Sequence, residues 1–183
     1  GDVYKRQAYF TDSEGGAWRV YPFVENTLCL QKAETPELFY ASAKAFGNFQ
    51  RMLKDYPADT LFETIEKFHD TEDRLRRFKA AVQADVMGRA GGVRPEIDFV
   101  LAREPDCSVA LEAQRAGKLP LRVTHNDTKL NNVLLDRRTG AAVCVIDLDT
   151  VMPGLAINDF GDSIRFGANH APEDEKDLSL IHI

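Results

Sequence analysis

The sequence has no long apolar run and no excess of basic charge. No uninterrupted apolar stretch approaches the ~18 residues that a membrane-spanning helix requires. The polar start GDVYKRQAYF lacks the pattern of a secretory signal. With 23 basic and 29 acidic residues the net charge is −6, so the electrostatic footprint expected for nucleic-acid binding is missing. We therefore predict a cytoplasmic protein whose partners include neither a membrane nor a nucleic acid.

Cysteine is sparse, and the common metal and nucleotide motifs are missing. Cys29, Cys107 and Cys144 are odd in number, far apart and without C-x-x-C or Cys/His ligand spacing. This fits a reducing cytoplasm. The sequence also contains no H-E-x-x-H and no G-x-x-x-x-G-K-[ST], so neither a zinc protease nor a P-loop enzyme is supported.

The length and composition allow one globular domain, or one domain plus a fragment. The 183 residues, of which 44% are hydrophobic, are enough to bury a sizeable core. The first residue is not methionine, and DVYKRQ at the start and LIHI at the end resemble translated adapter sequence. Residues 1–7 and 180–183 are therefore left out of the fold prediction, and we expect the chain to begin inside a longer gene.

The pattern of residues 17–57 predicts one strand and one long helix. The stretch AWRVYPFVEN, residues 17–26, is rich in aromatic and β-branched residues and follows the turn-like DSEGG, which indicates a strand leaving a hairpin. Pro36 can be the first residue of a helix that DYP ends. Apolar and small residues recur along it at helical spacing: Phe39, Ser42, Phe46, Phe49 and Leu53.

Further helices are expected up to residue 120. Asp70 or Thr71 can cap a helix with an apolar face formed by Leu75, Phe78, Val82 and Val86. GRAGG indicates a loop. Pro95 and Pro105 can each begin a short helix, the second ending near Gly117.

After Pro120 the pattern changes to short strands around the polar stretch THNDTKLNN. NVLLD and AAVCVID, joined by RRTG, predict a β-hairpin. Because the start of the first strand lies beside the end of the second in an antiparallel hairpin, Asn132 should lie next to Asp147, with Asp149 two residues further on. Oxygen ligands of this kind suit Mg²⁺. Asp127, five residues before Asn132, should share the same mouth.

This arrangement resembles the protein-kinase signature H-R-D-L-x-x-x-N followed by a metal-binding Asp after the next hairpin. Here it extends from His125 to Asn132, with Asn instead of Arg after the histidine, as in small-molecule kinases of the aminoglycoside phosphotransferase type. VTHNDTKLNNVLLD with VIDLDTVMPGLAINDFGDSIRFGAN is more specifically similar to N-acetylhexosamine 1-kinases. The resemblance covers Ala17 to Leu178.

The resemblance implies an α+β, protein-kinase-like fold that consists mostly of the helical large lobe with its catalytic-loop β-hairpin. Residues 1–25 would be the remnant of the small lobe and its hinge strand, and residues 26–183 the large lobe. The glycine-rich loop and lysine of the small lobe lie outside the chain. We expect truncation at both ends and an inactive isolated fragment.

The resemblance also implies roles for the polar residues. Asp127 would be the catalytic base that receives the proton of the attacking hydroxyl, and Lys129 would offset charge on the transferring phosphoryl group. Asn132 and Asp147 would hold the Mg²⁺ that bridges the phosphates of ATP, with Asp149 as an additional ligand.

Two residues are expected to act from behind the site. His125 would fix the loop by hydrogen bonds. Asp159 begins a literal D-F-G triplet, but it follows Asp127 by 32 residues, whereas Asp147 follows it by 20. The resemblance implies that Asp159 braces the loop through its backbone.

Three further segments have two interpretations each. Phe23, Val24 and Glu25 would be the hinge that takes the adenine edge, or a half-buried strand. Arg165 would reach the sugar or its phosphate, or pair with a nearby carboxylate. His69, in FHDT, would line the sugar site, or pack beside a helix cap.

The predicted function is therefore an ATP- and Mg²⁺-dependent kinase for a small hydroxylated molecule, with the anomeric hydroxyl of an N-acetylhexosamine as the leading acceptor. An aminoglycoside, choline or homoserine kinase is the alternative within the class. A catalytically silent nucleotide-binding scaffold is the alternative outside it, although such a scaffold would not need Asp127, Asn132 and Asp147 together. The sequence leaves the acceptor and the oligomeric state open.

Overall fold

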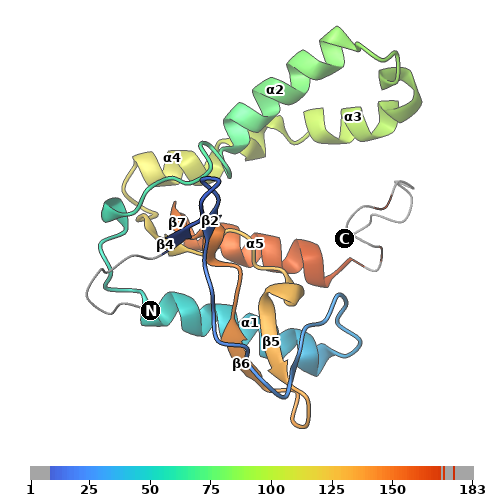
Figure 1. Cartoon of the computed structure of the whole chain (residues 1–183). Helices are drawn as coiled ribbons and strands as arrows, with labels where there is room; N and C mark the ends of the chain where they lie inside the picture. The colour runs from blue at the N-terminus through green and yellow to red at the C-terminus, as the bar shows by residue number, and fades with distance from the viewer. Residues whose placement is uncertain (1–8, 170, 172–174, 176–183) are drawn as a thin grey trace.

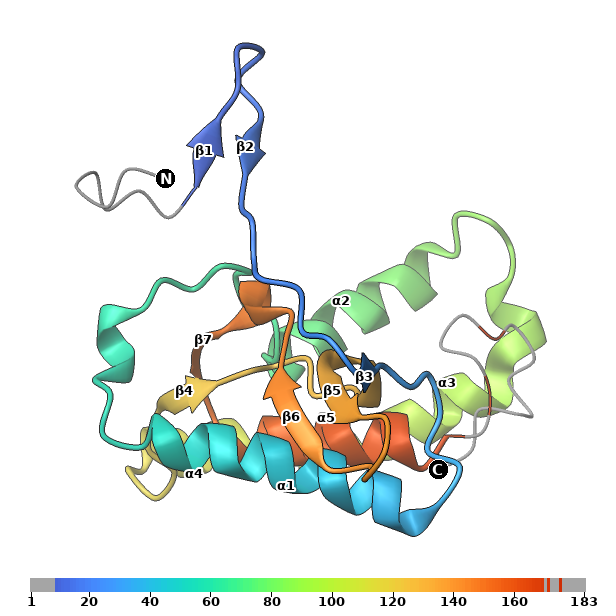
Figure 2. The ribbon, with the colours of Figure 1, turned by 60° about the horizontal axis from the view of Figure 1, so that its bottom comes forward.

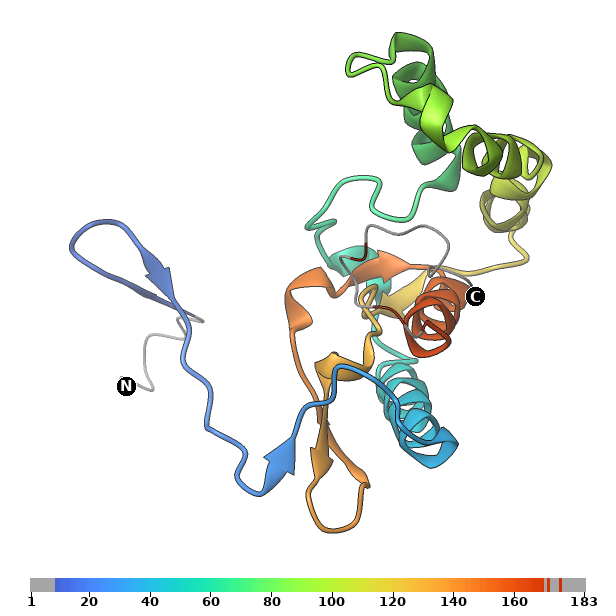
Figure 3. The same cartoon turned by 90° about the vertical axis from the view of Figure 1, so that its right-hand side faces the viewer.

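The computed structural model describes residues 9–169, 171 and 175, which form the mixed α+β structure that was predicted. Two of the three small antiparallel sheets lie against helices α1 (Pro36–Met52) and α5 (Ala156–Gly167), which run side by side (Figures 1 and 2). Helices α2 (Thr71–Ala84) and α3 (Arg94–Leu101) project away from this body as an arm (Figures 1 and 3). No helix in the described part of the chain is long and apolar enough to cross a bilayer.

The N-terminal hairpin is shorter than predicted. Strands β1 (Phe10–Thr11) and β2 (Ala17–Trp18) pair antiparallel, with Phe10 opposite Trp18, and project from the body (Figure 2). The strand predicted over residues 17–26 is wrong beyond Trp18, because residues 19–24 have no ladder partner among the described residues. A side chain such as Phe23, which is 89% exposed, has nothing to pack against there.

The predicted hairpin after residue 130 is confirmed. Strands β5 (Val133–Asp136) and β6 (Ala142–Val145) pair antiparallel, and β3 (Thr27–Leu28) joins the far edge of β5. In the turn, Asp136 Oδ1 accepts hydrogen bonds from the backbone N–H groups of Thr139 and Arg138, and these bonds lower the pKa of Asp136. Gly140 takes the left-handed conformation, φ 70°, which glycine adopts without strain.

Helix α1 follows the predicted pattern. Thr35 is its N-cap and accepts a hydrogen bond from the N–H of Leu38, and the helix ends at Met52, just before DYP. Its inward face buries Ser42 and Phe46. Phe46 forms the core with Val133 and Leu135 of β5. The helix therefore supports the hairpin from below.

The arm and the helix after it are only partly as predicted. Helix α2 (Thr71–Ala84) is capped by Asp70, but it ends at Asp85, a left-handed residue with φ 36°. Val86 lies beyond that end and is exposed, so its assignment to the apolar face was wrong. Helix α3 (Arg94–Leu101) has Pro95 in its first turn, after a 3-10 turn at Ala90–Val93.

The single helix predicted from Pro105 is two elements. A 3-10 turn spans Glu104–Cys107, and helix α4 spans Val109–Arg115, before Gly117 with φ 72°. The carbonyl oxygen of Cys107 accepts a hydrogen bond from Thr71 Oγ1 at 2.5 Å, so a tertiary contact uses the acceptor that a continuous helix would need.

The third sheet and the last helix were not predicted. Strand β4 (Arg122–Thr124) pairs antiparallel with β7 (Met152–Gly154), and α5 follows directly. The residues NDFGDSIRFG, expected only as part of a motif, thus form most of a helix beneath the polar stretch.

Two glycines of α5 should respond oppositely to alanine. A Cβ at Gly161 meets open space, so we expect Gly161→Ala to raise the free energy of unfolding by ~0.5–1 kcal/mol through helix propensity. A Cβ at Gly167 would lie 2.1 Å from Cε2 of Phe39, so Gly167→Ala should lower it by ~1–3 kcal/mol through overpacking. Urea denaturation of the two variants and the parent chain measures both, and destabilisation by Gly161→Ala would contradict the prediction.

Candidate active site

Asp159 lies beneath the polar loop, which we define as residues 125–132, between β4 and β5. It is 3% exposed, in the first turn of α5, where a carboxylate is stabilised by the helix dipole. Its oxygens accept the N–H groups of His125 at 3.0 Å and Asn126 at 2.8 Å, and Gln50 Nε2 of α1 at 2.7 Å. Its neighbour Phe160 is 71% exposed. The D-F-G triplet therefore stands on a helix, with its carboxylate holding the loop from behind.

His125 links the polar loop to the end of the hairpin. The ring is fully buried and edge-on to Phe46 and Phe49, at centroid distances of 5.2 and 5.7 Å. Its Nδ1 lies 3.4 Å from the N–H of Asp127 and its Nε2 3.0 Å from the carbonyl oxygen of Ile146. An acceptor Nδ1 requires a protonated Nε2, so His125 donates to Ile146.

Asp127, Asn132 and Lys129 are in contact. Asn132 Nδ2 donates to the carbonyl oxygen of Asp127 at 2.8 Å and to its Oδ2 at 2.9 Å. Lys129 Nζ lies 3.4 Å from the same Oδ2, and both charged side chains are partly buried. Within the described residues, no hydrogen bond uses Oδ1 of Asp127 or Oδ1 of Asn132. One oxygen of each residue is thus left for a ligand.

Asp147 lies at the same end of the hairpin as Asn132. Val133 pairs with Val145, and the N–H of Ile146 donates to the carbonyl oxygen of Asn132 at 2.9 Å. Asp147 follows in the left-handed region, φ 59°, which is uncommon for a non-glycine residue. Its exposed carboxylate makes no hydrogen bond or ion pair with any described residue.

The segment after Asp147 is tied to both the polar loop and the N-terminal strand region. Thr150 Oγ1 donates to the carbonyl oxygen of His125 at 2.6 Å, and Asn126 Nδ2 donates to that of Thr150 at 3.0 Å. Asp149 is exposed and pairs with Arg19, a hydrogen bond that raises the pKa of the guanidinium. Asp149 thus has a cationic partner within the chain.

The oxygen atoms of Asn132 and Asp147, at one end of the β5–β6 hairpin, suit a magnesium ion that is also bound by phosphates. Over the described residues, no three His, Cys, Asp or Glu side chains gather around one point. Mg²⁺ is commonly held by one or two protein groups, with substrate phosphates and water completing its shell. The uncommitted Oδ1 of Asn132 and the carboxylate of Asp147 fit that requirement, whereas the described residues do not form a closed cage of protein ligands.

The predicted hinge, residues 23–25, lies in the extended segment that leads from the projecting N-terminal hairpin to β3 (Figure 3). The carbonyl oxygen of Val24 accepts a hydrogen bond from Thr27 Oγ1 at 2.8 Å, Phe23 and Glu25 are exposed, and no strand forms there. The half-buried strand that was the alternative is therefore absent from residues 23–25.

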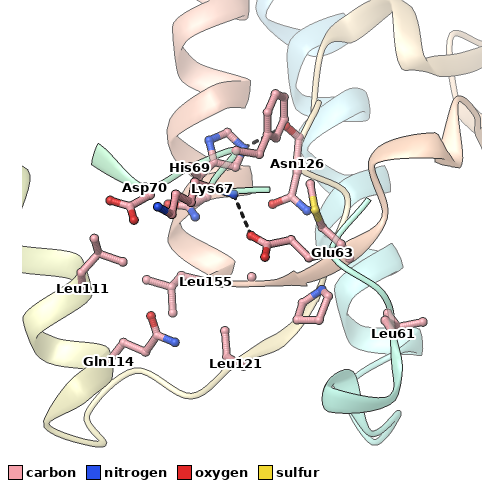
Figure 4. Close-up of a pocket in the computed structure, with 15 residues that line it drawn as sticks. Leu61, Glu63, Lys67, His69, Asp70, Leu111, Gln114, Leu121, Asn126 and Leu155 are labelled. Atoms are coloured by element: carbon pink, nitrogen blue, oxygen red, sulfur yellow. Dashed lines mark hydrogen bonds between the residues drawn. The ribbon is translucent and has the colours of Figure 1, made fainter. Parts of the chain in front are cut away.

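A pocket of about 320 Å³ adjoins the polar loop at Asn126 (Figure 4). His69 Nε2 lies 3.0 Å from the carbonyl oxygen of Asn126, and the His69 ring packs against Phe68. The pocket combines an apolar floor with polar side chains: Leu61, Glu63, Lys67, Phe68, His69, Asp70, Leu111, Gln114, Leu121, Asn126, Met152, Pro153, Gly154, Leu155 and Asn158.

Two residues beneath the polar loop, Asp162 and Gln50, were not identified by the sequence analysis as parts of the site. Asp162 Oδ2 accepts the N–H of Thr128 at 2.7 Å, and its Oδ1 accepts Arg165 Nε at 2.9 Å. Gln50 contacts Asp159 from α1. The only sequence signal was spacing: Asp162 stands one helical turn after Asp159, but that pattern becomes informative only once α5 is known to lie under the loop. Arg165 does not line the pocket.

A comparison with protein families agrees with this geometry. The family described as APH, the phosphotransferase enzyme family, matches residues 7–178, which include the polar loop, the β5–β6 hairpin and α5. The match spans most of the 183 residues. The chain therefore belongs to the APH phosphotransferase enzyme family, within the protein-kinase-like superfamily.

Proposed function

We propose that the chain carries the catalytic site of an ATP- and Mg²⁺-dependent kinase that phosphorylates a hydroxyl group of a small molecule. The contact among Asp127, Asn132 and Lys129 carries the proposal. One carboxylate oxygen of Asp127 is anchored by the amide of Asn132 and faces Lys129, while the other has no partner among the described residues. A hydroxyl group bound there would find an oriented acceptor for its proton.

The transfer itself breaks the bond between the γ-phosphorus and the bridging oxygen and forms one between that phosphorus and the acceptor oxygen. Asp127 Oδ1 takes the proton of the acceptor hydroxyl. Lys129, 3.4 Å from Oδ2 of the same carboxylate, offsets negative charge on the transferring group. The side chains of His125 and Asp159 keep the polar loop in place. His125 donates to the backbone carbonyl oxygen of Ile146, and Asp159 accepts hydrogen bonds from the backbone N–H groups of the loop.

Asn132 and Asp147 would hold Mg²⁺, which supplies charge neutralisation along the phosphates when bound. Asp149 is the additional ligand in this proposal. Its pairing with Arg19 means that metal binding there would compete with a guanidinium.

We also propose residues 26–183 as the large lobe of the enzyme and residues 1–25 as part of its small lobe and hinge. Support comes from the course of the chain: β1 and β2 project from the body, and the segment ending at Glu25 leads directly to β3 beside the catalytic hairpin (Figures 2 and 3). Phe23, Val24 and Glu25 would offer backbone groups to the adenine edge.

The proposed acceptor is an N-acetylhexosamine, bound in the pocket beside Asn126. Its polar side chains, among them His69, Asp70 and Gln114, would bind ring hydroxyl groups, while its leucine side chains would take the acetamido methyl group (Figure 4). His69 is in direct contact with the polar loop, one residue before Asp127. Through this contact, binding of the acceptor in the pocket would affect the position of Asp127.

The acceptor prediction is tested with a panel. The full-length gene product is assayed for ADP release with N-acetylglucosamine, N-acetylgalactosamine, an aminoglycoside, choline and homoserine. We expect kcat/KM for an N-acetylhexosamine to exceed that for the other acceptors at least ~100-fold, about 2.7 kcal/mol in the transition state. Preference for another acceptor would replace the substrate assignment. Nucleotide binding without release of ADP for any acceptor would favour the silent scaffold.

A further inference from the structure

The polar loop is held by two carboxylates of α5, one on each side of Asp127. Asp159 accepts the N–H groups of the two residues before Asp127. Asp162 accepts the N–H of Thr128, the residue after it, at 2.7 Å. The loop therefore has anchors at both flanks of the proposed base.

Asp162 is itself oriented from outside. Its Oδ2 faces Thr128, and its Oδ1 accepts a hydrogen bond from Arg165 Nε at 2.9 Å and forms an ion pair with Nη2 at 2.8 Å. The Asp162 side chain is 10% exposed, whereas that of Arg165 is 47% exposed. The guanidinium thus covers the carboxylate from the solvent side and limits its rotation.

The two anchors differ in what their loss would leave behind. Thr128 is buried, and its Oγ1 also donates to the carbonyl oxygen of Asp159 at 2.6 Å. Without Asp162 the Thr128 side chain remains attached, but its backbone N–H loses its acceptor. The peptide between Asp127 and Thr128 would then be free to tilt while α5 and β4 keep their places.

We propose that Asp162, oriented by Arg165, is a positioning residue that sets the direction of Asp127 and Lys129. Thr128 stands between these two residues, so the tilt of its peptide planes decides where the carboxylate and the ammonium group point. Phosphoryl transfer depends almost entirely on positioning and electrostatic stabilisation, so a small tilt of this peptide should lower kcat. The catalytic part of this inference rests on the proposed function.

The first test compares Asp162→Ala, Asp162→Asn and Arg165→Ala in the full-length gene product. We expect Asp162→Ala to lower kcat by roughly 10–100-fold, with KM for ATP within about twofold. Asp162→Asn should recover most of that loss, because its amide oxygen can still accept the N–H of Thr128. Arg165→Ala should fall between them. Full kcat for Asp162→Ala, or a loss of stability with kcat unchanged, would overturn the proposal.

The second test does not depend on enzymatic activity. Hydrogen exchange of the Thr128 amide should accelerate at least ~10-fold in Asp162→Ala, while exchange in α1 stays at the parent rate. An unchanged Thr128 amide would overturn the positioning role. Absence of ADP release from the parent protein would count against the proposed function alone, and the exchange result would still decide whether Asp162 holds the loop. If Asp162→Ala does not fold, Arg165→Ala takes its place as the variant with a weakened anchor, and Asp162→Asn remains the variant expected to keep it.

Discussion

Replacing Asp127 by asparagine is expected to lower the turnover number of the full-length gene product by at least ~100-fold, the scale of a lost general base. Asparagine has nearly the same shape, and its amide can still meet Asn132, but it has no oxygen basic enough to take the hydroxyl proton. The KM for ATP should change by less than about threefold, because Asp127 acts on the acceptor rather than on the nucleotide.

The matched control is Asp55→Asn. Asp55 is an exposed carboxylate just beyond the end of α1 that pairs with Lys54, and its replacement should leave turnover unchanged. Steady-state ADP release at saturating ATP and acceptor measures both variants. Turnover of Asp127→Asn equal to that of the parent would exclude Asp127 as the base.

The second large effect is on stability. Asp159→Ala removes the acceptor for two buried backbone N–H groups, of His125 and Asn126, and for Gln50 of α1. Each buried donor left unsatisfied costs ~1–3 kcal/mol, so the free energy of unfolding should fall by about 3 kcal/mol or more. This is a large part of the ~5–15 kcal/mol typical of a folded domain.

Asp149→Ala is the control for that experiment. Asp149 is next to Thr150, which contacts the polar loop, but its carboxylate is exposed and among the described residues contacts only the exposed Arg19. Its replacement should change stability by no more than about 0.5–1 kcal/mol. Urea denaturation of the two variants beside the parent chain measures the contrast, and equal effects would show that Asp159 does not hold the loop.

Local features of the fold could be predicted from the sequence because neighbouring residues decide them. Pro36 marks the start of α1, and Asp70, one of the two predicted caps, marks that of α2. The RRTG turn, with Gly140, joins β5 to β6, and the antiparallel register then brings Asn132 and Asp147 to one end of the hairpin. Capping, helical spacing and turn chemistry all act over a few residues.

The errors occur where a distant segment decides the outcome. Residues 19–24 have strand-like composition, but a strand exists only where another strand pairs with it. The helix expected from Pro105 is interrupted where Thr71 takes the carbonyl oxygen of Cys107. No local pattern shows either condition.

The sequence by itself determined the chemical groups of the site and their order along the chain: the polar loop, the hairpin and the carboxylates that follow. The hairpin also predicted Asp147 beside Asn132, and the resemblance implied Asp159 behind the loop, but only the tertiary structure decided which segments hold Asp159 there. Asp147 and Asp159 both follow Asp127 within a few dozen residues, but β4 pairs with β7 and places α5 under the loop. Asp159 is buried there by contacts from α1, 109 residues away in sequence, and long-range packing of that kind leaves no mark on the local pattern.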